Sequence, residues 1–373
     1  MKKILIFTEY FEPGYKAGGP IKSIKNMVDS LKDQFNFTII TKNKDLGDEY
    51  SYSNIDSDIF YNREWGNILY TNLTKLNIIE IKRMINKIKP DYIYLNSFFS
   101  PLSVKVYLCK LLLGINPEII IAPRGEFSPG ALDIKKNKKR IFLSFFKLLP
   151  FNFKFHSTDK LETKHITNQF HNKKISLAPN LPDPYTNIDK LIIKNENELN
   201  LIFISRISQK KNLHFLNSIF ENIKGKVNLD IFGPIENQEY FDETMKLLKC
   251  NENLKVNYKG HIENSKVSNT IRKYHYFILP TLGENYGHAI IESFLAKTPV
   301  IISDQTPWRN LKDLDIGFDI DLTNKEKWIE SVNLCLSENQ EKYNKKISAI
   351  EKFIVKLHSE RNRNIELSKK IFQ

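Results

Sequence analysis

Two glutamates in one short stretch of the sequence have the residue type and spacing to bind a polyhydroxylated ligand. The stretch GENYGHAIIE occupies residues 283–292 and contains Glu284 and Glu292. It follows an apolar run, 275–280, that predicts a buried strand, and its second half has the apolar spacing of a helix. Glu284 in the loop and Glu292 in the helix can then face one ligand. Carboxylates accept the hydrogen bonds that sugar and ribose hydroxyls donate.

The start of this predicted helix offers a second kind of ligand group, its first-turn backbone amides. Such amides, aimed at the end of the preceding strand, suit a diphosphate. They belong to Asn285, Tyr286, Gly287 and His288. The alternative interpretation is structural, with Glu284 capping the helix and Glu292 exposed to solvent.

A pair of cations follows another apolar run in the second half of the chain. Arg206 ends the predicted strand 199–206, and Lys211 opens the predicted helix 210–223. Both would project over the same strand ends as the loop of Glu284. Two fixed cations there can neutralise a diphosphate leaving group as its bond to a sugar breaks. The alternative is a pair of surface cations in a lysine-rich chain.

The elements that position these residues alternate between strands and helices, in two cycles. The first cycle opens with a short apolar run, the loop 13–20 with Gly18 and Gly19, and the amphipathic stretch 21–33. The second cycle begins near residue 199. The pattern predicts an α/β protein with two Rossmann-like domains facing each other across a cleft, and ligands beyond the carboxyl ends of the strands.

The expected division of the chain follows from its prolines, polar tracts and helical spacing. A Pro-containing polar tract separates the two cycles, and the last part of the chain is charged and helical, with the option of crossing back to the first domain. The expected parts are an N-terminal domain 1–183, a linker 184–198, a second domain 199–352 and a C-terminal helix 353–373. The family resemblance described below implies that the first domain binds the acceptor and the second the nucleotide-sugar.

Composition narrows the classes of protein that this chain can represent. The 373 residues carry a formal net charge of +13, which favours an anionic partner or reflects a Lys-rich compositional bias. The three scattered cysteines, Cys109, Cys250 and Cys335, predict reduced, buried thiols and suggest neither a disulfide framework nor a zinc site. The first apolar run is too short for a signal peptide, and we expect a cytoplasmic protein.

A basic and apolar segment stands out at residues 134–155. Five cations lie within 135–140, an apolar run with Phe142, Phe145, Phe146 and Leu149 follows, and the segment has no acidic residue. The composition fits a helix lying on an anionic membrane face. It fits equally a core helix preceded by a solvated basic loop.

Taken together, these motifs resemble family 4 of the retaining glycosyltransferases, and within it the members that build bacterial surface polysaccharides such as O-antigen and capsule. The resemblance spans nearly the whole chain and is strongest from 199 to 310. Beside Arg206, Lys211, Glu284 and Glu292, it rests on Gly18, Gly19, APRGEFSPGAL (122–132), PNLPDP (179–184) and TPW (306–308).

The resemblance implies a GT-B fold, a UDP- or GDP-sugar held mainly by the C-terminal domain, and no cofactor or metal ion. Arg206 and Lys211 would bind the diphosphate and stabilise the departing charge. Glu284 would bind the donor sugar's hydroxyls and Glu292 the ribose hydroxyls. Gly18 and Gly19 would let the first domain approach the phosphates, and the backbone of Gly260, His261 and Ile262 would contact the base. The transferred group would be a hexose or N-acetylhexosamine, and the acceptor a glycan or polyprenyl-linked saccharide.

The chain departs from the family at one point near the reacting carbon. Many members carry a histidine after the mid-domain strand, whereas this sequence reads PRGEF, with Arg124 and Glu126 on the acceptor side. We expect Arg124 to orient the acceptor or the phosphate. His156 is expected to be structural. A retaining, front-side reaction needs no protein base if the departing phosphate accepts the proton.

Other interpretations explain less of the sequence. The acidic pair Asp56 and Asp58 is a metal-dependent motif or, more simply, part of a solvated loop. A sugar-nucleotide epimerase or a phosphorylase would share the fold and phosphate site. A nucleic-acid-binding protein would explain only the charge, because no recognition motif accompanies it, and we expect no nucleic-acid partner.

Overall fold

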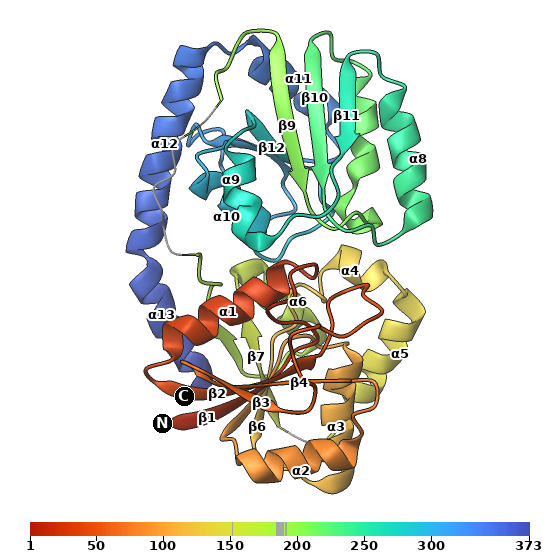
Figure 1. Ribbon diagram of the computed structural model, residues 1–373, viewed down its shortest axis with the longest axis vertical. Helices are drawn as coiled ribbons and strands as arrows, with labels where there is room; N and C mark the ends of the chain where they lie inside the picture. The colour runs from red at the N-terminus through yellow and green to blue at the C-terminus, as the bar shows by residue number, and fades with distance from the viewer. Residues whose placement is uncertain (151, 184–189, 191) are drawn as a thin grey trace. The chain divides into compact units, whose positions relative to one another are not determined.

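The computed structural model describes residues 1–150, 152–183, 190 and 192–373, and it divides into two compact units (Figure 1). Unit 1 comprises Met1–Leu181 and Arg361–Gln373, and unit 2 comprises Pro182–Glu360. Each unit contains a parallel sheet covered by helices. The predicted α/β class with two Rossmann-like domains and a helical C-terminal segment is therefore confirmed.

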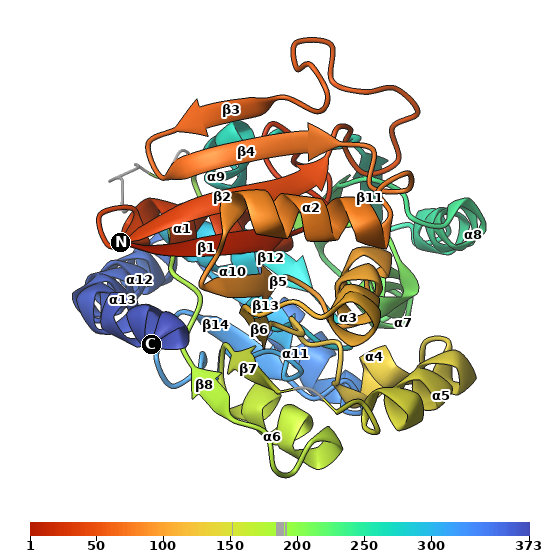
Figure 2. The same ribbon diagram turned by 90° about the horizontal axis from the view of Figure 1, so that it is seen from below.

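The described residues of unit 1 form an eight-stranded sheet in the order β3-β4-β2-β1-β5-β6-β7-β8, seen as a twisted row in Figure 2. Neighbouring strands are parallel, except that β3 and β4 form an antiparallel hairpin. Central strands such as YIYL and EIII are apolar almost throughout because both faces of a parallel sheet are covered. The strands are β1 (Lys2–Phe7), β2 (Phe35–Lys42), β3 (Phe60–Arg63), β4 (Gly66–Thr71), β5 (Tyr92–Leu95), β6 (Glu118–Ile121), β7 (Phe153–Ser157) and β8 (Ile175–Leu177).

Helices cover both faces of this sheet and divide its core into two clusters. One cluster contains residues of α2, α3, α5 and α6, and the other contains residues of α1 together with Ile371 and Phe372. The helical segments of unit 1 are α1 (Gly19–Leu31), α2 (Ile78–Ile88), α3 (Pro101–Leu113), α4 (Pro129–Asp133), α5 (Lys136–Phe146), α6 (Lys160–Gln169), α13 (Arg361–Lys369) and the 3-10 turn η4 (Lys370–Phe372).

Segments far apart in sequence meet where residues 361–373 join unit 1. The ring of Phe372 is fully buried among Phe35, Phe37 and Tyr94, at centroid distances of 5.2, 6.2 and 5.9 Å. Lys2 Nζ donates to the carbonyl oxygen of Phe372 at 3.1 Å. Residues 361–373 are thus part of the core of unit 1.

The described residues of unit 2 form a six-stranded parallel sheet in the order β11-β10-β9-β12-β13-β14. Its strands are β9 (Glu198–Ile204), β10 (Lys226–Phe232), β11 (Leu254–Tyr258), β12 (Tyr276–Leu279), β13 (Val300–Ser303) and β14 (Gly317–Ile320). Its helical segments are η1 (Gln209–Lys211), η2 (Leu213–Leu216), α7 (Asn217–Phe220), α8 (Gln238–Lys249), η3 (Asn264–Lys266), α9 (Val267–Ile271), α10 (His288–Leu295), α11 (Lys325–Ser337) and α12 (Gln340–Ser359).

The predicted boundaries of the linker and of the C-terminal helix can be compared with these elements. Of the predicted linker 184–198, residues 184–189 and 191 lie outside the described part, and Glu198 is the first residue of β9. The predicted boundary at residue 353 lies inside α12, and the segment that belongs to unit 1 begins at Arg361.

Two local predictions are wrong. The predicted helix 210–223 is broken into η1, η2 and the short α7, because Asn212 between the 3-10 turns has a left-handed backbone with φ 58°. The expectation of three buried thiols fails for Cys250, which is exposed in the turn after α8, whereas Cys109 and Cys335 are buried.

The described helices can be tested for a segment that could span a membrane. Among the described residues, none of the helices combines the length and the apolar content that crossing a bilayer requires.

Candidate active site

The strand order of unit 2 places a crevice at the carboxyl ends of β9 and β12. The chain runs from β9 to its neighbour β10 on one side, whereas β12 lies on the other side of β9. At such a switch point the connections from the two strands run to opposite sides of the sheet, and ligands of parallel α/β sheets bind there. The loop after β9 contains Arg206 and Lys211, and the loop after β12 contains Glu284.

These two loops are joined by an ion pair. Lys211 Nζ contacts Glu284 Oε1, and the two side chains are 12% and 14% exposed. Backbone bonds hold the loops in place, since Leu282 N donates to the Lys210 oxygen at 2.9 Å and Glu284 N donates to the Gln305 oxygen at 2.9 Å. Lys211 and Glu284, predicted separately from the sequence, therefore meet at the switch point.

Arg206 lies at the same edge and is also paired. Its Nη1 lies 2.7 Å from Glu236 Oε1, and both side chains are partly exposed. Glu236 follows β10, and its backbone amide donates to the Ile207 oxygen at 3.1 Å. Sequence analysis missed Glu236. Its position just beyond a predicted strand, on the neighbour of β9, is the signal that could have found it.

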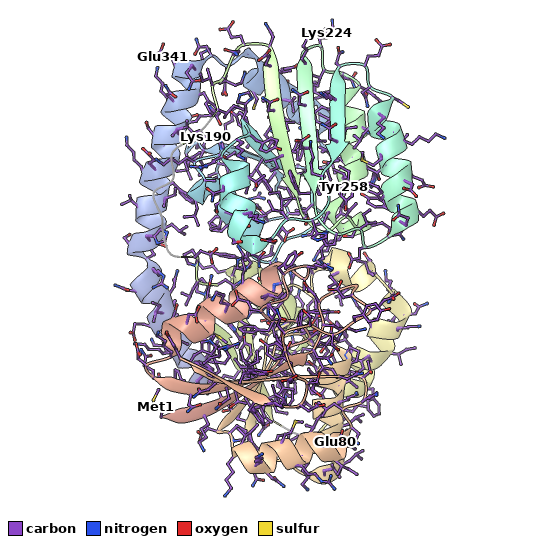
Figure 3. All side chains as sticks on the ribbon, in the orientation of Figure 1. Met1, Glu80, Lys190, Lys224, Tyr258 and Glu341 are labelled. Carbon is purple, nitrogen blue, oxygen red and sulfur yellow. The ribbon has the colours of Figure 1, made fainter. Side chains whose placement is uncertain are left out.

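A close backbone contact joins the ends of β9, β10 and β11. Gly233 has φ 141°, and a Cβ atom built on it would lie 1.8 Å from the Ser205 oxygen. Gly233 N donates to the Gly260 oxygen at 2.8 Å, and its own oxygen accepts from the hydroxyl of Tyr258, labelled in Figure 3. Gly260 is therefore linked through Gly233 to the residue that precedes Arg206.

The three residues predicted to contact a base follow β11 at this edge. Gly260 has φ 76°, and a Cβ atom there would meet no atom within 4 Å. His261 is exposed, and Ile262 packs against the core of unit 2. Of these three residues, His261 is the most exposed, and Gly260 and Ile262 are partly exposed.

Helix α10 begins at His288, with Gly287 as its N-cap residue. Gly287 has φ 73°, and a Cβ atom there would lie 2.7 Å from Ile290 Cδ1, so the turn requires glycine. The described first turn carries no acidic side chain and no side-chain cap. Glu284 therefore does not cap this helix. Glu292 is only 6% exposed, so the alternative of a solvent-exposed Glu292 is also wrong.

The other two predicted residues of this loop differ in their surroundings. Asn285 is half-buried. The ring of Tyr286 is buried beside Trp308, at a centroid distance of 5.5 Å, and burial followed by the negative charge of Asp183 raises its pKa. Tyr286 therefore anchors the loop to the core, and only its backbone is available to a ligand.

In unit 1 the predicted glycines lie after β1, at the carboxyl edge of the sheet. Gly18 is the N-cap residue of α1, with φ 68°, and the helix begins at Gly19. The loop before them is fixed by Asp45 Oδ2, which accepts from the amides of Tyr15 at 2.8 Å and Lys16 at 3.1 Å. The described first turn of α1 has no acidic residue. Pro20 in this turn has no amide hydrogen, and the Ile21 amide donates to the Gly18 oxygen at 3.1 Å.

Arg124 and Glu126 follow β6 and have different surroundings. Arg124 is half-exposed and bonded to Asn96, Asn180 and Tyr94. Glu126 accepts from Ser97 Oγ at 2.7 Å and from the Phe98 amide at 2.5 Å, and burial raises its pKa. Glu126 therefore fixes the loop before α3, whereas Arg124 remains available to a ligand.

His156 is structural, as its burial and bonding show. Its Nδ1 lies 2.7 Å from the Tyr94 hydroxyl, and its Nε2 lies 2.9 Å from the Ala178 oxygen. Burial and the positive charge of Arg124 lower its pKa to about 3. With both nitrogens bonded inside the protein, His156 is not placed to accept a proton from substrate.

The acidic pair Asp56 and Asp58 lies before the edge strand β3. Asp58 Oδ1 accepts from Thr71 Oγ1 at 2.5 Å, and Asp56 N donates to the Tyr61 hydroxyl at 2.7 Å. Asp58 thus serves the folding of its own loop.

The structure therefore gathers the predicted residues at one edge in each unit. In unit 2 the edge carries Arg206, Lys211, Glu284, Gly260 and the start of α10. In unit 1 it carries Gly18, Gly19 and Arg124.

Comparison with protein families now identifies the domain that contains the ion pair. Residues 185–353 match the family Glycosyl transferases group 1. The fold of the two units is that of the GT-B type, in agreement with the resemblance seen in the sequence.

Solved structures with the same architecture extend over both units of this chain. Sucrose-phosphate synthase from Thermosynechococcus elongatus superimposes with a TM-score of 0.70 at 14% identity, covering 94% of each chain. HepE from Anabaena, in complex with UDP-glucose, gives 0.68 at 14% identity and covers 100% of this chain and 98% of its own. The lipopolysaccharide outer core galactosyltransferase WaaB gives 0.62 at 13% identity, covering 99% and 100%. A search of the curated proteins finds no match.

Proposed function

We propose that this glycosyltransferase transfers a hexose or N-acetylhexosamine from a UDP- or GDP-sugar, with retention of configuration, to a glycan or polyprenyl-linked saccharide. The product belongs to a bacterial surface polysaccharide such as O-antigen or capsule. The observation that carries the proposal is the ion pair between Lys211 and Glu284 at the switch point, with Arg206 at the same edge. Two cations for a diphosphate and one carboxylate for sugar hydroxyls form a charge-matched set for a nucleotide-sugar.

The chemistry assigns each group a separate task. The bond from the sugar C1 to the diphosphate oxygen breaks, a bond from C1 to the acceptor oxygen forms, and negative charge grows on the diphosphate. Arg206, Lys211 and the first-turn amides of α10 stabilise that charge, which lowers the barrier. Glu284 orients the sugar and Glu292 binds the ribose. The departing phosphate takes the acceptor's proton.

The solved neighbours support a nucleotide-sugar as the donor. HepE was crystallised with UDP-glucose, and the similar trehalose-6-phosphate synthase from E. coli with UDP-2-fluoro glucose. WaaB and WaaG act in lipopolysaccharide synthesis by their descriptions, which supports an acceptor from the same broad class.

The proposal is tested by thermal denaturation with UDP-glucose, UDP-N-acetylglucosamine, UDP-galactose and GDP-mannose, each beside its free nucleotide diphosphate. A ligand at 100 times its Kd stabilises the folded state by about 2.7 kcal/mol. We expect one nucleotide-sugar to stabilise more than its diphosphate. We expect Glu284→Gln to reduce that stabilisation to the level of the diphosphate, because the sugar loses its acceptor group.

Glu263→Gln is the matched control, because Glu263 is an exposed carboxylate of unit 2 paired with Lys266 at 3.0 Å. It should respond as the native protein does. If no nucleotide-sugar exceeds its diphosphate, or if Glu284→Gln retains the full response, the donor assignment is wrong.

A second part of the proposal concerns the surface on which the acceptor is presented, the anionic cytoplasmic face of the membrane. Helix α5 has two apolar faces. Leu143 and Phe146 are buried in the core, whereas Ile141, Phe145 and Leu148 are 72%, 60% and 80% exposed. Ile141 and Phe145 are spaced at i and i+4, so they lie on one side of the helix, and Leu148 follows in the turn after the helix. The interpretation of α5 as a core helix alone does not explain this outer face.

Cations surround the exposed apolar side chains of α5. Lys135, Lys138, Arg140 and Lys147 are exposed, and Lys136 forms a surface pair with Asp133 at 3.0 Å. Each cation near an anionic bilayer contributes about 1 kcal/mol, and each apolar side chain that enters it contributes about 1.5–3 kcal/mol. The combination suits peripheral attachment to the membrane that holds a polyprenyl-linked acceptor.

A further inference from the structure

The loop after β6 holds an arginine in a backbone conformation that is uncommon for this residue. Arg124 has φ 54° and Gly125 has φ 78°, so two consecutive residues are left-handed. The turn closes with a bond from the Glu126 amide to the Pro123 oxygen at 3.1 Å, and the Gly125 amide donates to Glu162 Oε1 at 2.7 Å. Left-handed backbone at a residue with a side chain costs free energy, and it persists where surrounding structure enforces it, often at functional sites.

Three neutral oxygen atoms hold the guanidinium of Arg124. Its Nε donates to Asn96 Oδ1 at 2.8 Å, its Nη1 to Asn180 Oδ1 at 2.7 Å, and its Nη2 to the Tyr94 hydroxyl at 2.9 Å. Asn96, Asn180 and Tyr94 are themselves buried. A guanidinium has five N–H groups, so these bonds leave two of them unused.

The hydroxyl of Tyr94 is oriented by His156. Because burial and the nearby Arg124 lower the pKa of His156 to about 3, its ring is neutral near pH 7. Its Nε2 faces the Ala178 carbonyl and therefore carries the proton, and Nδ1 accepts from the Tyr94 hydroxyl. The lone pairs of Tyr94 Oη are thus directed to Arg124, and the chain from Ala178 to Arg124 is satisfied at every step.

The charge of Arg124 has no counterpart among the described residues. No described carboxylate forms an ion pair with it. The two nearest acids of the turn serve other groups: Glu126 binds Ser97 and the Phe98 amide, and Glu162 binds the Gly125 amide and Thr158. A side chain that only links strand ends by hydrogen bonds does not need a charge. A half-buried cation that is held by neutral groups alone strongly attracts an anion.

The location of Arg124 is also that of a ligand site. Asn96 follows β5, and its Nδ2 donates to Oγ1 of Thr8, which follows β1, at 3.4 Å. Strand β1 lies between β2 and β5, so the switch point of this sheet is at β1 and β5. Arg124 is therefore fixed next to the crevice in which α/β sheets bind ligands.

We propose that Arg124 is a preorganised anion anchor, which binds a phosphate or carboxylate group of a substrate at the strand ends of unit 1. The inference rests on the proposed function, because that function supplies two sources of such a group. One source is an acidic group on the acceptor, and the other is the diphosphate of the donor. Asn96, Asn180 and Tyr94 are positioning residues that hold the guanidinium in its binding orientation.

The test compares anion binding by Arg124→Gln and by Asn180→Asp with binding by the native protein. Asn180→Asp preserves the shape of the side chain and supplies the missing carboxylate 2.7 Å from Nη1. If Arg124 were only a structural cross-link, this variant would be as stable as the native protein or more stable, with unchanged ligand binding. If Arg124 is an anion anchor, the fold persists and the anion no longer binds.

The probes are inorganic phosphate, glucose 6-phosphate and glucuronate for the acceptor arm, UDP for the donor arm, and glucose as the neutral control. Titrations followed by thermal denaturation give the apparent Kd of each probe. We expect at least one anion to bind the native protein and to bind both variants roughly 10- to 100-fold more weakly, the range for a hydrogen bond to a charged group. Arg83→Gln, an exposed arginine of α2, should bind as the native protein does.

The outcomes of these titrations distinguish the two sources of the anion, the acceptor and the donor. Loss confined to UDP assigns Arg124 to the donor, and loss confined to the small anions assigns it to the acceptor. Unchanged affinity in Asn180→Asp, or no anion bound by the native protein, overturns the proposal. The small anions are titrated without donor. Their binding to Arg124 can therefore be interpreted even if the nucleotide-sugar assignment fails.

Discussion

At the scale of single residues, the charged groups at the switch point of unit 2 neutralise one another. Lys211 is paired with Glu284, and Arg206 with Glu236. A diphosphate must therefore replace carboxylates that are already in place, rather than meet free cations. For the partly exposed Arg206 the exchange costs little, since such pairs contribute about 0–1 kcal/mol. Lys211 is more buried, so a phosphate that pairs with it must take nearly the position that the Glu284 carboxylate now has. This favours ligands that also form hydrogen bonds with the displaced carboxylate.

Sequence reasoning reached Lys211 and Glu284 because each follows an apolar run that predicts a strand, and strand ends share one edge. Glu236 has the same relation to β10, but its partner depends on the neighbouring order of β9 and β10, which no local pattern specifies. The neutral surroundings of Arg124 are likewise a property of three strand ends, those of β5, β6 and β8. No sequence pattern marks the residues that bind Arg124, which are Asn96, Asn180 and Tyr94. Their role is visible only in the fold, where these strand ends lie side by side.

Gly233 allows a prediction at the same scale. A Cβ atom in Gly233→Ala would overlap the Ser205 oxygen, and its φ of 141° disfavours a side chain. We expect a loss of about 1–3 kcal/mol in the free energy of unfolding, with displacement of the loop that carries Arg206. Gly283→Ala is the control, because a Cβ atom there meets no atom within 4 Å. Equal urea midpoints for the two variants would show that β9 and β10 do not need this contact.

At the scale of elements, patterns of apolar residues predicted most strands and the long helices well. Strands such as β9 (ELNLIFI) and β13 (VIIS) consist mainly of Ile, Leu, Val and Phe, as a parallel sheet covered on both faces requires. The break at Asn212 was missed, because apolar spacing continues through residues 213–220 while the backbone reverses its φ. The hairpin of β3 and β4 was missed because β3 is an exposed, polar edge strand.

Helix α5 has a prediction of its own. We expect the native protein to float with vesicles of phosphatidylglycerol and phosphatidylcholine, to bind less as salt rises, and not to float with phosphatidylcholine alone. Replacing Ile141, Phe145 and Leu148 with serine should abolish flotation, because the side chains that enter the bilayer are removed.

The control for α5 is the triple serine variant at Leu247, Leu334 and Val355, three exposed apolar residues of unit 2. It should float as the native protein does, and both triple variants should retain nucleotide-sugar binding. Absence of flotation by the native protein at physiological salt would contradict the membrane assignment, as would equal flotation of the α5 variant.

At the scale of the whole molecule, residues distant in sequence complete unit 1. Phe372 is fully buried against the rings of Phe35, Phe37, Tyr92 and Tyr94. Phe372→Ala would leave a cavity in this cluster, and we expect a loss of about 3–5 kcal/mol in the free energy of unfolding. Phe60→Ala, in the exposed strand β3, should change stability little. The measurement is unfolding in urea, followed by hydrogen exchange of the amides in unit 1. Equal protection of these amides from exchange in the two variants would refute the prediction.

The position of Phe372 also sets an order of events during synthesis. Unit 2 is one continuous segment, and its residues leave the ribosome before residues 361–373. Domains fold as their residues emerge, so unit 2 can complete its core while unit 1 still lacks Ile371 and Phe372. Tyr94, which orients Arg124, packs against Phe372 at a centroid distance of 5.9 Å. The residues that hold Arg124, the proposed anion anchor, are therefore completed only after unit 2 has been made.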